Sequence, residues 1–343
     1  MRNLPLPLRE DLSERFFVRP ETVVKINSDN DGTAKMVFQF EDRGAGNNSA
    51  VEVEAVLLSD RAGRKTACLS TQAGCPMKCV FCKTGSAGFL RNLDSAEIVE
   101  QFFQLKEFAE KREEESAAIG GGATGTAVSG QPPLPVSNIV VMGMGEPLLN
   151  LAELRRAIAV ITDPQGLNFS RRRITVSTCG IAEGIDDLAD RGPDVRLALS
   201  LTTADESLRR RLMPVTENQS LDKVKAALRR FQDKGGMRIT LEAALLGGIN
   251  TRSDDAAAVA AFAKGLDVSV NLIPWNPVAG LEFEGKPLRE PSAAEVESYA
   301  ACLESFGLKV TRRFRRGRGV AGACGQLGHI PGKKDLIIVN DSM

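Results

Sequence analysis

Short apolar runs alternate with amphipathic segments along most of the chain after Thr66. The apolar runs that predict strands are Ala67–Ser70, Asn138–Met142, Ile174–Ser177, Arg196–Leu201, Arg238–Leu245 and Val268–Leu272. Amphipathic helices are expected between them, at Ser95–Glu110, Leu151–Ile161, Ile181–Asp190, Leu221–Phe231 and Asp254–Lys264. Six such repeats predict an α/β fold with a parallel sheet, either doubly wound or an incomplete barrel. In both arrangements the functional edge is at the carboxyl ends of the strands.

The first 62 residues follow a different pattern. A short charged helix is expected near Leu8–Phe17, and two alternating stretches follow at Ala34–Phe40 and Val51–Leu58. The Gly- and Asn-rich link Arg43–Asn48 between those stretches predicts a hairpin loop. We therefore expect a small α+β accessory element over residues 1–62.

Two further segments complete the predicted organisation. The α/β domain is expected over residues 63–314, ending with a strand near Leu308–Arg313, and a Gly-rich tail carrying Cys324 follows over 315–343. Residues 113–135 (EEESAAIGGGATGTAVSGQPPLP) interrupt the domain. Their Gly, Ala, Ser and Pro content predicts a flexible surface insertion.

Composition narrows the function classes. The formal net charge of zero excludes the strong global field of a small nucleic-acid-binding domain, so any nucleic-acid contact depends on local basic clusters. Such clusters occur at Arg171–Arg173, Arg209–Arg211 and Lys309–Arg318. No long apolar run or signal peptide is apparent, which predicts a cytoplasmic protein without membrane association. In that compartment the seven cysteines are expected to be ligands, catalysts or buried thiols.

Three cysteines form the strongest chemical signal in the chain. Cys75, Cys79 and Cys82 have the spacing C-x3-C-x2-C, and soft sulfur ligands suit iron–sulfur centres or zinc. Structural zinc takes four protein ligands, and the single histidine, His329, is distant in sequence. A [4Fe–4S] cluster held by three cysteines leaves one iron open to S-adenosylmethionine (SAM). The alternatives are a zinc site completed from elsewhere and a chance group of buried thiols.

Six motifs in order resemble the RlmN/Cfr family of radical SAM RNA methyltransferases, from Leu8 to Gly328. They are LSTQAGCPMKCVFCKTG, GFLRNL, VVMGMGEPLLN, ITVSTCG, VNLIPWNP and ACGQL. The resemblance implies an incomplete (β/α)6 radical SAM barrel that holds a [4Fe–4S] cluster and uses two SAM molecules. One SAM methylates a cysteine near the C-terminus. The second yields a radical, and the carbon is then transferred to an adenine ring through a covalent intermediate.

The resemblance also assigns three reacting residues. Cys324 matches the methyl-carrying cysteine, Cys68 the cysteine that resolves the intermediate, and Glu54 the proton acceptor. A disulfide bond is a further implied feature. Each residue has a simpler interpretation: a small residue in a flexible tail for Cys324, core packing for Cys68, and a solvent-facing strand position for Glu54.

Residues of the SAM site follow from the same comparison. Gly145 permits close backbone approach, and the carboxylate of Glu146 can accept from the SAM ammonium group. The other matching positions lie at predicted strand ends and are Ser177, Ser200, Thr202 and Asn276. Thr202 stands where the family commonly has histidine. Ordinary strand-end caps or turns are the alternative interpretation of these polar residues.

The predicted reaction is methylation of C2 of an adenosine in 23S rRNA, with tRNA as a further candidate substrate. An external electron donor such as flavodoxin is expected, as is a monomer. One alternative is Cfr-like methylation at C8. Another is a diverged radical SAM enzyme with a non-RNA substrate, since the chain begins after the N-terminal helical domain usual in the family. A non-enzymatic, zinc-binding RNA adaptor is the alternative from a different class.

Overall fold

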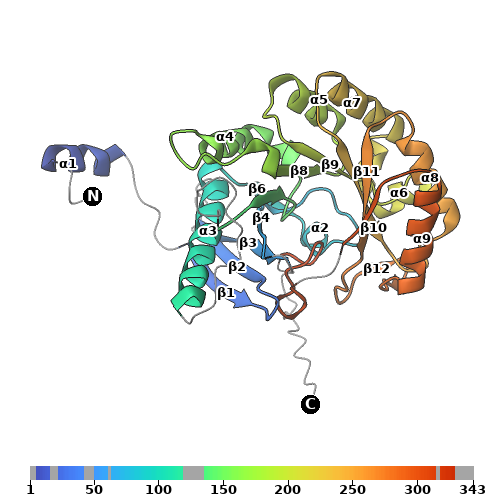
Figure 1. The fold of residues 1–343 in the computed structure, drawn as a ribbon, viewed down its shortest axis with the longest axis horizontal. Helices are drawn as coiled ribbons and strands as arrows, with labels where there is room; N and C mark the ends of the chain where they lie inside the picture. Colours follow the sequence, from blue (N-terminus) through green and yellow to red (C-terminus); the bar gives the residue numbers. More distant parts are fainter. Residues whose placement is uncertain are drawn as a thin grey trace, which may run out of the picture.

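The principal feature of the fold is one ten-stranded sheet (Figure 1). The computed structural model describes residues 5–15, 22–41, 50–60, 63–118, 135–313 and 317–328. The strands, in spatial order, are β1 (Val23–Ser28), β2 (Ala34–Glu41), β3 (Ala50–Ser59), β4 (Lys65–Cys68), β7 (Asn138–Val141), β8 (Ile174–Thr178), β9 (Arg196–Ser200), β10 (Ile239–Leu245), β11 (Val268–Pro274) and β14 (Val310–Arg312).

The seven barrel strands are parallel, and their spatial order follows the sequence. They are β4, β7, β8, β9, β10, β11 and β14. A doubly wound sheet reverses its strand order, whereas a barrel adds strands in one direction. The sheet is therefore a singly wound, incomplete barrel, as predicted. Its outer helices are α3 (Ser95–Ala118), α4 (Leu151–Thr162), α5 (Ala182–Arg191), α7 (Leu221–Asp233), α8 (Ser253–Ala263) and α9 (Ala293–Ser305) (Figure 1).

Shorter elements lie mainly at the ends of the barrel strands. They are the helices α2 (Lys83–Ala87) and α6 (Glu206–Leu212), the 3-10 turns η1 (Pro147–Asn150), η2 (Arg171–Arg173), η3 (Pro214–Glu217) and η4 (Arg318–Val320), and the strand pairs β5 (Gln72–Gly74) with β6 (Phe89–Asn92) and β12 (Glu282–Phe283) with β13 (Lys286–Pro287). Helix α1 (Leu6–Arg15) precedes the sheet.

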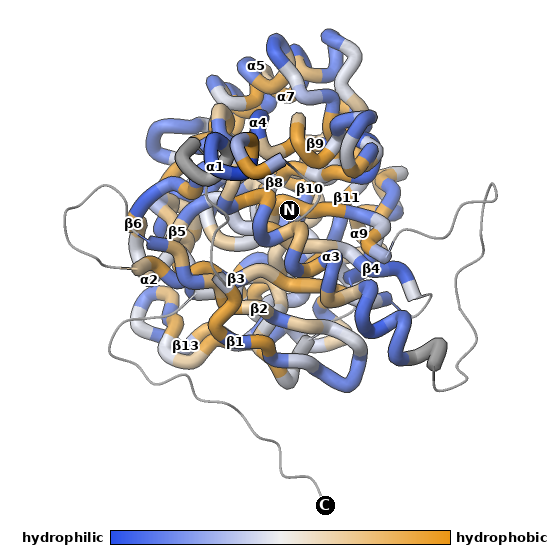
Figure 2. The backbone as a smooth tube through the Cα atoms, turned by 90° about the vertical axis from the view of Figure 1, so that its left-hand side faces the viewer, coloured by the Kyte–Doolittle hydropathy of each residue, from blue (hydrophilic) through white to orange (hydrophobic). Residues whose placement is uncertain are grey.

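Helix α7 illustrates how the sequence forms the outer layer. Ser220 caps its first turn by accepting from the backbone N–H of Lys223, and Leu221, Val224 and Leu228 are buried at helical spacing. The opposite face of the helix is charged. The same two-sided pattern is visible around the barrel, where hydrophobic strands lie inside and hydrophilic helix segments outside (Figure 2).

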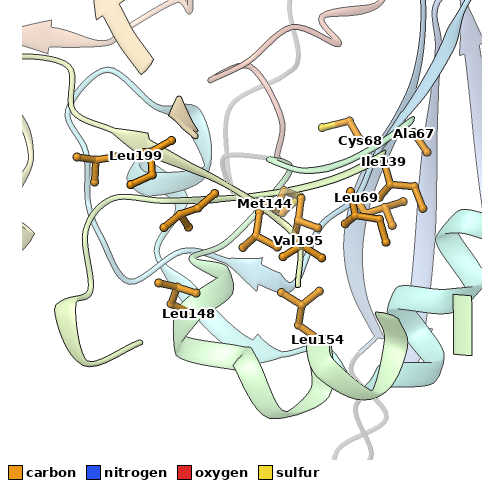
Figure 3. Close-up of a cluster of buried hydrophobic side chains, with 14 of the residues drawn as sticks. Ala67, Cys68, Leu69, Ile139, Met144, Leu148, Leu154, Val195 and Leu199 are labelled. Carbon is orange, nitrogen blue, oxygen red and sulfur yellow. The ribbon is translucent and has the colours of Figure 1, made fainter. Parts of the chain in front are cut away.

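One extended core joins the sheet to these helices. Figure 3 shows part of it beside β4 and β7, where Ala67, Leu69 and Ile139 pack close together. Cys68 lies at the edge of this cluster, at the carboxyl end of β4. The core therefore fixes the strand end from which Cys68 is presented.

The accessory element extends the barrel sheet. Strands β1, β2 and β3 are antiparallel, and β3 pairs antiparallel with β4, so the predicted β2–β3 hairpin is confirmed. Its loop, Arg43–Asn48, lies outside the described residues. Strand β1 was not predicted, because its short stretch VVKINS is largely exposed and has no strong alternation.

Two boundaries differ from the predictions. Helix α3 continues to Ala118, so the start of the expected 113–135 insertion (EEESAA) is helical, consistent with the helix propensity of Glu and Ala. Residues 119–134 lie outside the described part. Strand β4 ends at Cys68, two residues before the predicted end. Within the described ranges, no helix is long and apolar enough to cross a membrane.

Candidate active site

A cavity of about 180 Å³ lies at the carboxyl ends of the barrel strands. All the predicted site residues except Cys68 and Glu54 line it, namely Cys75, Cys79, Cys82, Gly145, Glu146, Ser177, Ser200, Thr202, Asn276 and Cys324. These residues come from positions 75–324 of the chain. The parallel strand order brings them together, because they end or follow strands that are neighbours in the barrel.

The three cysteines lie on the loop between β5 and α2. This loop is tied down by backbone hydrogen bonds from Cys75 N to Gly88 O (2.8 Å) and from Cys82 N to Cys79 O (3.1 Å). Gly85 packs so closely that a Cβ there would lie 3.0 Å from the backbone of Cys79. These contacts hold the loop conformation through its backbone.

The chemistry of these thiols favours a metal cluster. Burial raises the pKa of Cys75 to about 12 and raises the pKa values of Cys79 and Cys82 as well. Buried thiols of this kind become thiolates when a cation binds them. Among the described residues, no three His, Cys, Asp or Glu side chains are arranged to hold one metal ion. Three soft thiolates on one loop are a donor set that suits an iron–sulfur cluster with one open iron site.

Gly145 and Glu146 form the turn after β7. Gly145 has a φ of 105°, and a Cβ there would lie 2.6 Å from Gln72, so only glycine fits without rearrangement. The Glu146 carboxylate accepts from the backbone N–H groups of Leu148 (3.1 Å) and Cys179 (2.8 Å). Burial raises the pKa of Glu146, while these donors act in the opposite direction. The carboxylate is thereby fixed at the cavity wall.

A polar network crosses the cavity floor. The hydroxyls of Ser177 and Ser200 are 3.2 Å apart, and Ser177 donates to the carboxylate of Glu242 (3.2 Å). Asn271 also donates to Glu242 (3.4 Å). Sequence reasoning missed Glu242, although an acidic residue inside the apolar strand ITLEAAL was a usable signal.

Thr202 and Asn276 are both buried, and each forms a hydrogen bond to another part of the protein. Thr202 has a φ of 62°, uncommon for a β-branched residue, and its carbonyl accepts from Asn250 Nδ2 (2.9 Å). Asn276 Nδ2 donates to the backbone carbonyl of Cys324 (3.1 Å). Asn276 therefore holds the C-terminal segment in addition to lining the cavity.

Residues 317–328, which we call the cysteine segment, cross the mouth of the barrel. Asp31 and Asp29 of the β1–β2 turn accept from the backbone N–H groups of Gly317 and Gly319, both at 2.9 Å. Farther along, the backbone N–H of Lys83 donates to Gly325 O at 2.8 Å. The accessory element and the loop that carries Cys75, Cys79 and Cys82 together hold the segment that contains Cys324.

A second, larger cavity of about 400 Å³ adjoins the first. Cys68 lines this second cavity only, whereas Cys324 and Asn276 line both. Cys324 thus stands at the boundary between a space lined by the cluster cysteines and a space lined by Cys68. Burial raises the pKa of Cys68 to about 12.

Glu54 lines neither cavity. Its carboxylate lies beneath the cysteine segment, where Oε1 pairs with Lys35 Nζ (2.9 Å) and Oε2 accepts from Gly328 N (2.7 Å). The interpretation of Glu54 as a solvent-facing strand residue is wrong, because it is only 8% exposed. Its place on β3 does bring it next to the segment that carries Cys324.

The basic clusters are only partly surface features. Arg209 is fully buried, so the expectation that it contacts RNA phosphate is wrong. Its guanidinium donates to backbone carbonyls that include Cys179 O (2.6 Å) and to Thr216 Oγ1 (2.7 Å). Arg171–Arg173 is exposed, whereas Arg315 and Arg316 lie outside the described residues.

All seven cysteines are free thiols in the structure. The disulfide implied by the family resemblance is therefore not formed in this state. Cys179 lies in the wall of the smaller cavity, and Cys302 lies on the outer helix α9.

Comparison with known proteins gives consistent matches. Residues 132–259 match the Radical SAM superfamily. A Treponema pallidum protein named "Probable dual-specificity RNA methyltransferase RlmN" is 46% identical over 97% of this chain and 87% of its own length. A protein of the same name from Heliobacterium modesticaldum is 40% identical over 95% and 78%. The crystal structure of a radical SAM methyltransferase from Sphaerobacter thermophilus has 34% identity and a TM-score of 0.81, covering 95% of this chain and 86% of that one.

Proposed function

Because this chain belongs to the RlmN/Cfr family of radical SAM RNA methyltransferases, we propose that it adds a methyl group to C2 of an adenosine in 23S rRNA. The observation that supports the proposal most strongly is the position of Cys324 between the two cavities. A methyl carrier must reach both the donor and the acceptor, and Cys324 alone among the cysteines lines both spaces.

Cys75, Cys79 and Cys82 would hold the [4Fe–4S] cluster, and Gly145, Glu146, Ser177, Ser200, Thr202 and Asn276 would surround SAM in the smaller cavity. When bound, the cluster supplies the electron that cleaves SAM reductively. The surrounding residues fix the geometry and restrict access of water, which matters for a reactive radical.

The remaining roles concern Cys324 and Cys68, which line the larger cavity, and Glu54, which lies beneath the cysteine segment. Cys324 would accept the methyl group and transfer its carbon to the adenine. Cys68, at the end of β4, would release the adduct from Cys324. Glu54 would accept the ring proton, which requires the cysteine segment above it to shift, since Gly328 N now donates to its carboxylate.

The proposed partners follow from this reaction. The RNA substrate is expected to be 23S rRNA, with tRNA as a second substrate, as the dual-specificity name of the relatives suggests. An external one-electron donor such as flavodoxin is needed for the cluster. We expect the enzyme to act as a monomer in the cytoplasm.

Nucleoside analysis tests the proposal. Reconstituted enzyme is incubated with SAM, a reductant and unmodified 23S rRNA or tRNA, and the digested RNA is analysed by mass spectrometry against methyladenosine standards. We expect 2-methyladenosine with the wild type and none with Cys324→Ala. Exclusive 8-methyladenosine would favour the Cfr-like reaction. SAM cleavage without any RNA product would favour a different substrate.

A further inference from the structure

The proposed reaction needs a nucleophilic sulfur at Cys324, and the residue that supplies the necessary charge is not among those assigned above. A thiol reacts with the methyl group of SAM as its thiolate, so a cation beside the sulfur accelerates the transfer. Arg313 lies in this position. Its Nη1 is 3.6 Å from Cys324 Sγ, and Arg313 lines the larger cavity together with Cys68 and Cys324.

The backbone holds Arg313 firmly in place. It follows β14 directly, and its N–H donates to Leu272 O of β11 at 2.9 Å. The side chain therefore starts from the carboxyl edge of the sheet, where the cavities open.

The charged and titratable groups that face Arg313 are Cys324, Cys68 and Glu242, and those that face Cys324 are Arg313, Cys68 and Cys82. The interaction with Cys324 is the main cause that raises the pKa of Arg313, so the guanidinium remains a cation. Glu242 already accepts hydrogen bonds from Ser177 and Asn271. No ion-pair distance between Arg313 and a carboxylate is found among the described residues, and its Nη1 points to the sulfur.

The preceding arginine shows the contrast. Arg312 also lines the larger cavity, but it pairs with Glu297 (3.1 Å) and Glu304 (2.9 Å) of helix α9, so its charge is balanced by carboxylates. Successive side chains of a strand point to opposite sides. The sequence Arg312-Arg313 thus places one arginine among carboxylates and the next beside a thiol.

We propose that Arg313 positions the Cys324 sulfur for the first methyl transfer and stabilises the negative charge on that sulfur as the thiol proton leaves, a role that rests on the proposed function of Cys324. In this step the thiol proton leaves to solvent, and the Cys324 sulfur forms a bond to the methyl carbon of SAM. The bond between that carbon and the SAM sulfur breaks at the same time. Its electron pair stays on the departing S-adenosylhomocysteine, and the neutral thioether no longer needs the cation.

The test compares Arg313→Gln, Arg313→Lys and the neighbouring Arg312→Gln in reconstituted enzyme. Alkylation of Cys324 by iodoacetamide is followed by peptide mass spectrometry as a function of pH, without RNA. Removing the cation in Arg313→Gln is expected to slow alkylation of Cys324 about tenfold near pH 7, with a smaller difference at alkaline pH. Arg313→Lys keeps most of the wild-type rate, and Arg312→Gln keeps the wild-type profile.

S-methylation of Cys324 by SAM is measured in the same proteins. A slower methylation in Arg313→Gln, in parallel with alkylation, supports the role of the charge. An unchanged pH profile in Arg313→Gln would overturn the inference, as would faster alkylation at every pH, which indicates only a steric function. Failure of the proposed function is distinct: wild-type Cys324 would then show the arginine-dependent pH profile but no S-methylation.

Discussion

At the scale of single residues, Arg209 is a buried charge, although the sequence pattern had predicted it on the surface. Arg209 stands in a run of three arginines, but its guanidinium is enclosed between the ends of β8 and β9 and turn η3. The hydrogen bonds from its fork-shaped donors reach the backbone carbonyls of Cys179, Ser200 and Leu201 in the interior. Its neighbour Arg210 is exposed and, within the described part of the chain, forms an ion pair with Glu206.

Replacing these two arginines should therefore have different effects. Arg209→Ala leaves several buried carbonyls without donors and creates a cavity, so we expect a loss of about 3–5 kcal/mol in the free energy of unfolding. Arg210→Ala should change it by less than about 0.5 kcal/mol. Urea unfolding of the two variants measures the difference. Equal effects of the two substitutions would contradict the buried role of Arg209.

Cys68 gives a prediction about pH. Burial raises the pKa of its thiol from 9.0 to about 12. Above pH 9 the unfolded chain loses this proton while the folded chain keeps it, so folding stability falls as pH rises from about 9 to about 12. The expected slope for one group is up to about 1.4 kcal/mol per pH unit. Cys68→Ala should remove this contribution, and unfolding measured at several alkaline pH values tests it. Cys302→Ala controls for loss of a thiol elsewhere, and an unchanged slope in Cys68→Ala would count against the buried-thiol explanation.

At the scale of elements, the β1–β2 turn anchors the cysteine segment. It presents Asp29 and Asp31 to the backbone of the cysteine segment, and Lys35 of β2 pairs with Glu54 beneath the same segment. The accessory element thus acts as a clamp for Cys324. This connection joins residues that are almost 290 positions apart in the chain.

Removing the clamp should loosen the segment. In Asp29→Ala/Asp31→Ala, amide hydrogen exchange over residues 317–328 is expected to rise about tenfold, because two charge-assisted hydrogen bonds are lost. Exchange in the barrel strands should not change. Asp267→Ala, which removes an exposed partner of Arg238, is the matched control. Unaltered exchange in the double variant would show that other contacts hold the segment.

Much of the barrel could be predicted from sequence, since apolar runs such as Asn138–Met142 and Val268–Leu272 are clear periodic signals. The spacing of Cys75, Cys79 and Cys82 similarly predicted that these three thiols lie close to one another, and all three line the smaller cavity. The position of Glu54 relative to Gly328, or of Arg313 relative to Cys324, could not be predicted by spacing, because these contacts join distant segments across the barrel mouth. The same applies to Arg209, whose charged neighbours suggested a solvated surface.

At the scale of the whole molecule, the incomplete barrel creates two adjoining cavities with Cys324 between them. The smaller is lined by the cluster cysteines, and the larger by Cys68 and Arg313. A closed barrel would have packed side chains in its interior, whereas the open sheet leaves room at its mouth. We propose that Cys324 carries a methyl carbon from the smaller cavity to the larger one.

Isotope transfer tests this claim most directly. The enzyme is first treated with SAM carrying a carbon-13 methyl group, freed of unbound SAM, and then given RNA with unlabelled SAM and reductant for a single turnover. We predict that the methyladenosine formed in this first turnover contains carbon-13 and that Cys324 loses its label. Unlabelled methyladenosine, with carbon-13 still on Cys324, would contradict the account.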